Sequence, residues 1–226
     1  MNTNIDLQNN RFLEFLLAGN DSASEFLRLA TIRYTLPELD PIFSVYRRND
    51  SFLDQDGKRE VMLDYIIKNR DKSQNAIEFQ VAKYREKEAL RFQALGFLLL
   101  KKEEQRLGAF ELANTVYQII FLTNKPPKAH LLINHFRMRS PEGFTSPYND
   151  DIPVRVYITL PLAIDKVNEQ GLENLNEFEQ FCYVLATGIV DPILKETNKM
   201  VQMLMMKYDQ MIGKQTFLPT DCGGCL

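Results

Sequence analysis

The order of apolar and polar residues along the chain predicts alternating helices and strands. Apolar residues recur at helical spacing in four segments, which are 8–30 (interrupted at Gly19-Asn20), 83–112, 173–187 and 190–212. Short runs rich in β-branched and aromatic residues predict six strands, at 42–47, 60–67, 76–82, 115–122, 130–139 and 153–160. Together these elements predict an α/β fold, with a mixed central sheet flanked by helices.

Three polar side chains interrupt the second and third of these strands. Asp64 lies in one apolar run, Glu78 and Gln80 lie in the next, and the polar segment 68–75 between them predicts a loop. On a strand, Glu78 and Gln80 share one face, and Asp64 joins them if the two strands pair. Two carboxylates on a half-buried face repel each other and are costly to desolvate, which favours a bound cation. A solvent-exposed acidic sheet face is the competing interpretation, and the pattern alone favours it.

The motif around these residues is similar to that of a known family. Leu63-Asp64 in one strand, Ile77-Glu78-Phe79-Gln80 in the next and a charged helix carrying Arg91 resemble the PD-(D/E)XK nuclease superfamily. The resemblance is strongest to its transposase-associated, recombination-promoting branch. It implies a restriction-endonuclease-like core in which Asp64, Glu78 and Gln80 are catalytic. It also implies that Asp64, Glu78 and the backbone carbonyl of Phe79 bind Mg²⁺ or Mn²⁺, which prefer oxygen ligands.

The same resemblance leaves the source of positive charge at the site open. Gln80 stands where most of the superfamily has a lysine, although the recombination-promoting branch itself uses glutamine. The net charge of the chain is −3, but residues 81–106 are net positive, so Lys83, Arg85 and Arg91 are candidates to contact the phosphates of duplex DNA. A helix with mixed surface charge is the alternative interpretation of this segment.

The resemblance leaves two functions open. The first is a Mg²⁺-dependent DNA endonuclease, a hydrolase of phosphodiester bonds linked to transposition or recombination. The second is a catalytically inactive DNA-binding or protein-interaction module on the same fold. Departures from the branch keep the second function open. The first helix has only Glu14 near the place where the branch has an aspartate, and the helix after Gln80 has Arg91-Phe92-Gln93-Ala94 in place of the usual pair of tyrosines.

Length and composition bound the domain organisation and the environment. The 226 residues, 45% of them hydrophobic and 25% charged, suit one nuclease-like α/β domain over 1–165, followed by a helical extension and mobile tail over 166–226. No apolar run reaches transmembrane length, and the N-terminus lacks the features of a signal peptide. Three cysteines are typical of a reducing compartment, so we expect a cytoplasmic protein that does not bind membranes.

The remaining titratable residues give weaker signals. His130 and His135 are five apart on an expected strand and therefore face opposite ways, which excludes a shared metal there. Cys222 and Cys225 supply only half a zinc site and fall in the expected tail. Asp54-Gln55-Asp56-Gly57 lacks the other ligands of a calcium loop and predicts a turn. Methionines in the last helix indicate either a face packed on the core or a homodimer surface.

Overall fold

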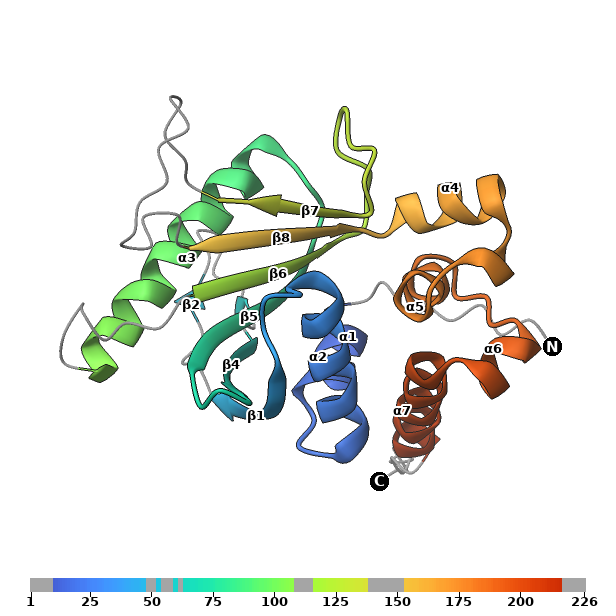
Figure 1. Cartoon of the computed structure of the whole chain (residues 1–226), viewed down its shortest axis with the longest axis horizontal. Coiled ribbons are helices and arrows are strands. Elements are labelled where there is room, and N and C mark those ends of the chain that lie inside the picture. The colour runs from blue at the N-terminus through green and yellow to red at the C-terminus, as the bar shows by residue number, and fades with distance from the viewer. Residues whose placement is uncertain are drawn as a thin grey trace, which may run out of the picture.

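The computed structural model describes residues 10–47, 52–53, 59–60, 63–107, 116–137 and 153–216. Its centre is a six-stranded mixed sheet in the order β1-β4-β5-β6-β8-β7 (Figure 1). The strands are β1 (Pro41–Arg47), β4 (Leu63–Asn69), β5 (Gln74–Ala82), β6 (Val116–Leu122), β7 (Ile133–Phe136) and β8 (Val154–Thr159). A separate antiparallel pair joins β2 (Phe52–Leu53) and β3 (Arg59–Glu60).

The sheet combines an antiparallel half with a parallel centre. Strands β1, β4 and β5 form an antiparallel meander, whereas β5, β6 and β8 run parallel and β7 returns antiparallel to β8. A parallel connection needs a long crossover, and helix α3 (Glu86–Leu107) supplies it between β5 and β6. The crossover carries α3 over one face of the sheet, while the two helices that precede β1 lie against the opposite face and the helices that follow β8 lie to one side (Figure 1).

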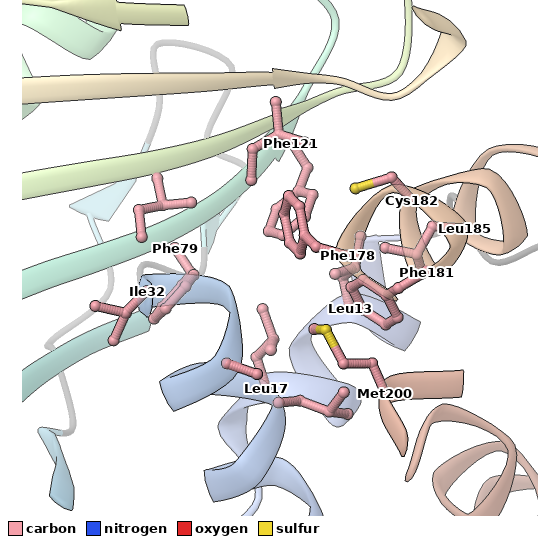
Figure 2. Packing of buried hydrophobic residues seen from close by; sticks show 14 of the residues in the cluster. Leu13, Leu17, Ile32, Phe79, Phe121, Phe178, Phe181, Cys182, Leu185 and Met200 are labelled. Carbon is pink, nitrogen blue, oxygen red and sulfur yellow. The ribbon is translucent and has the colours of Figure 1, made fainter. Parts of the chain in front are cut away.

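The main hydrophobic core lies on the face away from α3. Alternate strand residues such as Phe79 and Phe121 point into it and meet Phe178, Phe181 and Met200 from the helices (Figure 2). Most of the helical residues in this core come from α1 (Asn10–Ala18), α2 (Ser22–Thr35), α5 (Glu177–Thr187) and α7 (Lys199–Thr216). Burying each large apolar side chain here stabilises the fold by about 1.5–3 kcal/mol relative to its exposure to water.

Helix α3 covers the other face through two small apolar clusters rather than one continuous core. One cluster gathers around Phe92 and consists of Phe92, Ile120, Leu122 and Tyr157. The other gathers around Leu99 and consists of Ile66, Ala76, Leu99 and Val116. Between the two clusters the sheet presents polar residues to α3, and these form the candidate site.

Helix ends in the C-terminal half have explicit sequence signals. Asn176 and Glu179 form a capping box at the start of α5, and Gly188 ends that helix in the left-handed conformation, with φ of 69°. The remaining helical elements are α4 (Pro161–Gln170), the 3₁₀ turn η2 (Leu172–Asn174) and α6 (Pro192–Thr197). Among the described residues, no helix has the length and apolar character needed to cross a membrane.

The expected α/β class and mixed sheet are confirmed, and several boundaries are wrong. The helix expected at 190–212 is two helices, because Asn198 leaves the helical conformation and its side chain accepts a hydrogen bond from the Val201 amide, 2.9 Å away. The strand expected at 60–67 is displaced, since Glu60 belongs to β3 and β4 continues to Asn69. Helix α4 was not expected, because Pro161 looked like the end of a strand rather than the first turn of a helix.

Other expectations meet the structure only in part. The strand expected at 130–139 appears as β7, so His130 lies in the preceding loop and not on a strand with His135. Residues 54–57, Cys222 and Cys225 lie outside the described residues. Of the methionines on α7, Met200, Met203, Met205 and Met211 pack in or against the main core, whereas Met206 is exposed. The domain boundary at 165 and the homodimer stay predictions.

Candidate functional site

A row of paired residues crosses the sheet beneath α3. Asp64 of β4 pairs with Glu78 of β5, Glu78 pairs with Gln118 of β6, and Gln118 pairs with Arg155 of β8. Residues paired in this way lie on one face of a sheet, about 4.8 Å apart from strand to strand. The strand pairing on which the expected cluster depends is therefore present. The Asp64 side chain itself lies outside the described residues.

Glu78 is the centre of this row. Its side chain is fully buried, with 0% exposure, in the middle of the sheet. One carboxylate oxygen accepts a hydrogen bond from Nε2 of Gln80, and the other accepts one from Nε2 of Gln118 at 3.0 Å. An ionised carboxylate can only accept hydrogen bonds, so both glutamines must turn their amide nitrogens towards it. The site is thus built around one buried carboxylate held from two strands.

The glutamine orientation leaves two carbonyl oxygens beside the carboxylate. Oε1 of Gln80 and Oε1 of Gln118 are buried and make no hydrogen bond within the described residues. A buried acceptor without a partner costs free energy, of the order of 1–3 kcal/mol. Each of these two oxygens can accept a hydrogen bond from a water molecule.

Helix α3 closes over this row at a glycine. A Cβ atom on Gly96 would lie 2.7 Å from Oε1 of Gln118 and 2.8 Å from Cγ of Pro153. Distances this short do not occur between real side chains, so only glycine lets the helix backbone approach the carboxamide so closely. Glycine at this helical position lowers the stability of α3 by about 1 kcal/mol relative to alanine.

The expected DNA-contacting residues Lys83 and Arg85 lie just before the start of α3. Both are exposed, in the connection between β5 and the helix. Asn124 fixes this connection, because its Oδ1 accepts from the Tyr84 amide at 2.6 Å and its Nδ2 donates to the Tyr84 carbonyl at 3.2 Å. The two cations therefore project from an anchored segment. A phosphate-binding role for them stays a prediction.

Arg91, the third expected DNA-contacting residue, is partly engaged within α3. Its Nη2 lies 2.9 Å from Oε2 of Glu88, and the two side chains are 33% and 26% exposed. The pair partly neutralises the positive charge expected of Arg91. DNA phosphate would have to compete with Glu88 for this guanidinium.

Arg155 and Tyr157 lie at the other end of the row and were not expected from the sequence. Nη1 of Arg155 donates to the Tyr157 hydroxyl at 3.4 Å. Burial raises the pKa of Tyr157, and the neighbouring guanidinium opposes that rise only in part. Tyr157 is therefore a neutral phenol at physiological pH, and Arg155 supplies a positive charge about three strand spacings from Asp64.

Gln118 was also missed, although the sequence carries a signal for it. It is the one amide in the run Val116-Tyr117-Gln118-Ile119-Ile120-Phe121-Leu122, whose other members are apolar. A polar side chain in the middle of a buried strand must find a partner or destabilise the core. The partner is Glu78, 40 residues away in the sequence.

The described residues contain neither a cluster of three metal-ligating side chains nor an activated cysteine. No three His, Cys, Asp or Glu side chains in the described ranges come together in a way that could hold a metal ion. Burial raises the pKa of the Cys182 thiol well above its ordinary value, with a smaller contribution from Glu179, so this cysteine is not an activated nucleophile. The Phe79 side chain packs into the main core, and the role of its carbonyl as a metal ligand stays a prediction.

The residues present fit a hard divalent cation. Two carboxylate residues, Asp64 and Glu78, are paired across neighbouring strands, and Oε1 of Gln80 makes no hydrogen bond within the described residues. Gln118 instead turns Nε2 to Glu78 and Oε1 to Gly96 of α3. Mg²⁺ and Mn²⁺ prefer oxygen ligands and keep several waters, so one or two carboxylates suffice.

Comparisons of this chain with protein-family models, with curated proteins and with solved structures found no match. The resemblance to a nuclease motif therefore rests on the residues of the site alone.

Proposed function

We propose that this protein is a divalent-metal-dependent DNA endonuclease, a hydrolase of phosphodiester bonds linked to transposition or recombination. The observation that carries the proposal is the direct pairing of Asp64 with Glu78 across β4 and β5. Had the register been shifted by one residue, the two acids would occupy opposite faces of the sheet and could not share a cation.

The order of elements supports the same proposal. The antiparallel strands β1, β4 and β5 are followed by α3 and then by β6, which is parallel to β5. This is the arrangement that the resemblance to the PD-(D/E)XK superfamily implies for a restriction-endonuclease-like core. The acidic pair lies on β4 and β5, two consecutive strands of that meander, as the resemblance implies.

Each residue of the site has a distinct role in this proposal. Asp64 and Glu78 hold Mg²⁺ or Mn²⁺, and a bound ion of this kind activates water and offsets charge on the scissile phosphate. Gln80, whose amide nitrogen is tied to Glu78, has its carbonyl oxygen left to orient a water molecule. Lys83 and Arg85, exposed on an anchored segment, contact the DNA backbone.

One observation favours the catalytically inactive alternative. Both oxygens of Glu78 already accept hydrogen bonds from glutamine amides, and the residue is completely buried. A carboxylate satisfied in this way can serve the fold alone. In that case the protein would bind DNA or another protein through its surface without cutting.

A nicking experiment separates the two functions. Purified wild-type protein is incubated with supercoiled plasmid in Mg²⁺, in Mn²⁺ and in EDTA, and relaxed and linear products are quantified. We expect nicking that requires the metal and is lost in Asp64→Ala. Asp71→Ala is the matched control, because Asp71 is an exposed acid in the turn joining the same two strands.

The outcomes are distinct. Nicking by wild type and by Asp71→Ala, but not by Asp64→Ala, supports the endonuclease. Salt-sensitive DNA binding without any nicking supports the inactive module. Nicking that persists in Asp64→Ala would assign cleavage to another site or to a contaminant and would end the proposal.

A further inference from the structure

We infer that Gln118 is a positioning residue of the metal site, which fixes the Glu78 carboxylate from the neighbouring strand. The inference rests on the proposed function, since it concerns how the same site is held. Gln118 lies outside the Asp…Glu-x-Gln motif and nearly forty residues beyond it in the sequence. Only the pairing of β5 with β6 brings it to Glu78.

The contact between the two residues is short and buried. Both side chains have 0% exposure, and Nε2 of Gln118 donates to Oε2 of Glu78 at 3.0 Å. Gln80 donates to the other oxygen from the same strand as Glu78. The carboxylate therefore accepts a hydrogen bond on each oxygen, one from its own strand and one from the neighbouring strand.

Gln118 is itself held by the helix above it. Its Oε1 sits where a side chain at Gly96 would begin, 2.7 Å from the ideal Cβ position. A flip of the carboxamide would place its oxygen against the Glu78 carboxylate. Two hydrogen-bond acceptors would then face each other, which is unfavourable. Sheet and helix thus leave Gln118 one orientation, with the amide towards Glu78 and the carbonyl towards α3.

A metal ligand that is already held in place favours cation binding, because ordering a flexible ligand costs conformational entropy when the cation binds. Groups that orient metal ligands without touching the metal typically contribute 10-fold to 100-fold in affinity. Gln118 occupies such a place for Glu78.

The test is Mn²⁺ binding by the full-length chain, measured by titration calorimetry or by the electron paramagnetic resonance of free Mn²⁺. Gln118→Met keeps the length of the side chain and removes the N–H donor. We expect Mn²⁺ affinity to fall about 10-fold or more. Thr159→Val is the matched control, because Thr159 is a buried polar residue on the same sheet face whose hydroxyl has no partner in the described structure.

A double-mutant cycle shows whether Gln118 acts through Glu78. Glu78→Asp retains a carboxylate but shortens the side chain by one methylene and withdraws it from Gln118. We expect Gln118→Met to weaken Mn²⁺ binding much less in the Glu78→Asp background than in the wild type. A residue that only supports the fold would give the same loss in both backgrounds.

Each result decides the inference. Wild-type affinity in Gln118→Met overturns it while leaving the metal site and the proposed function intact. Absence of Mn²⁺ binding by the wild-type chain overturns it together with the proposed metal site. If Gln118→Met does not fold, Gln118→Asn keeps a carboxamide but withdraws its amide nitrogen from Glu78 by one methylene group, and unchanged affinity in that variant overturns the inference as well.

Discussion

The two faces of the central sheet are built from different chemistry although they share every strand. Strand β6 shows the contrast, because Ile119 and Phe121 enter the main core while Gln118 and Ile120 face α3. The core face is one continuous apolar cluster (Figure 2). The α3 face is two small clusters with a polar row between them.

The difference teaches which face stabilises the fold and which face is a candidate for function. Apolar burial on the core face contributes free energy in proportion to area. A buried carboxylate with two amides contributes far less, because its desolvation offsets most of what its hydrogen bonds gain. The α3 face therefore holds residues that are costly for stability, and this cost is usual at sites where charge is used.

The largest effect on stability is expected on the core face. Phe121→Ala removes a fully buried ring from the main cluster and should lower the free energy of unfolding by about 3–5 kcal/mol, measured by urea denaturation. Phe136→Ala is the control, since this ring is 49% exposed at the edge strand and its loss should cost less than about 1 kcal/mol. Equal losses in the two variants would contradict the contrast between buried and edge positions.

The next effect separates function from stability on the α3 face. Glu78→Gln keeps the size of the side chain and removes the charge, so metal-dependent nicking should fall at least about 100-fold. The free energy of unfolding should change by less than about 2 kcal/mol, because two effects of the substitution oppose each other. A neutral carboxamide costs less to bury than a carboxylate, but it accepts weaker hydrogen bonds from the two neighbouring glutamine amides. Plasmid nicking and urea denaturation of the same preparation check both halves, and full nicking activity would contradict the assignment of Glu78.

A smaller effect tests how closely α3 approaches the polar row. Gly96→Ala should lower the free energy of unfolding by about 1–3 kcal/mol, because the added methyl group meets Gln118 and Pro153. Ala94→Gly, at an exposed position of the same helix, is the control and should cost about 1 kcal/mol through helix propensity alone. If Gly96→Ala were stabilising, the gain in helix propensity would exceed the cost of the steric contact. The added methyl group would then not meet Gln118 and Pro153 as closely as described.

The smallest effect concerns a salt link on the core side. Burial raises the pKa of Asp21, but hydrogen bonds from Lys207, at 2.6 Å, and from Ser24 outweigh burial and lower that pKa from 3.8 to about 2. A lowered pKa stabilises the folded state above pH 4, and this stability is lost as the pH falls towards 2. The loss should be about 1 kcal/mol, less than the shift implies, because the carboxylate is partly exposed.

Asp21→Asn removes this titration and serves as its control. Urea denaturation of both proteins between pH 5 and pH 2 should show the wild type losing its advantage over the variant as the pH falls. A constant difference between the two proteins over that range would show that the Lys207 link does not depend on the charge of Asp21.

Much of the fold could be predicted from local pattern. The runs 76–82 and 115–122 correspond closely to β5 and β6, because strands buried on both faces are mostly apolar, here interrupted by Glu78, Gln80 and Gln118. The break at Gly19-Asn20 separates α1 from α2 as expected. The ends of elements were less predictable. At Asn198 the sequence does not distinguish a helix cap from a helix interior, and only the hydrogen bond from the Val201 amide to its side chain identifies the cap.

The candidate site could be predicted only in its local half. Glu78 and Gln80 share a face through the two-residue period of a strand, which the sequence contains. Gln118 and Arg155 could not be found in this way, because they reach the site through pairing with strands distant in the sequence. Gly96 likewise gains its meaning only from the carboxamide beneath it.

The sequence by itself determined the alternation of strands and helices and the motif that places a carboxylate and an amide together on β5. Tertiary structure decided that Asp64 lies opposite Glu78, that Gln118 grips the same carboxylate, and that α3 closes over both. The physical reason is the sequence separation over which each interaction acts. Periodicity and capping act within a few residues, whereas strand register and helix packing depend on which apolar faces are buried together.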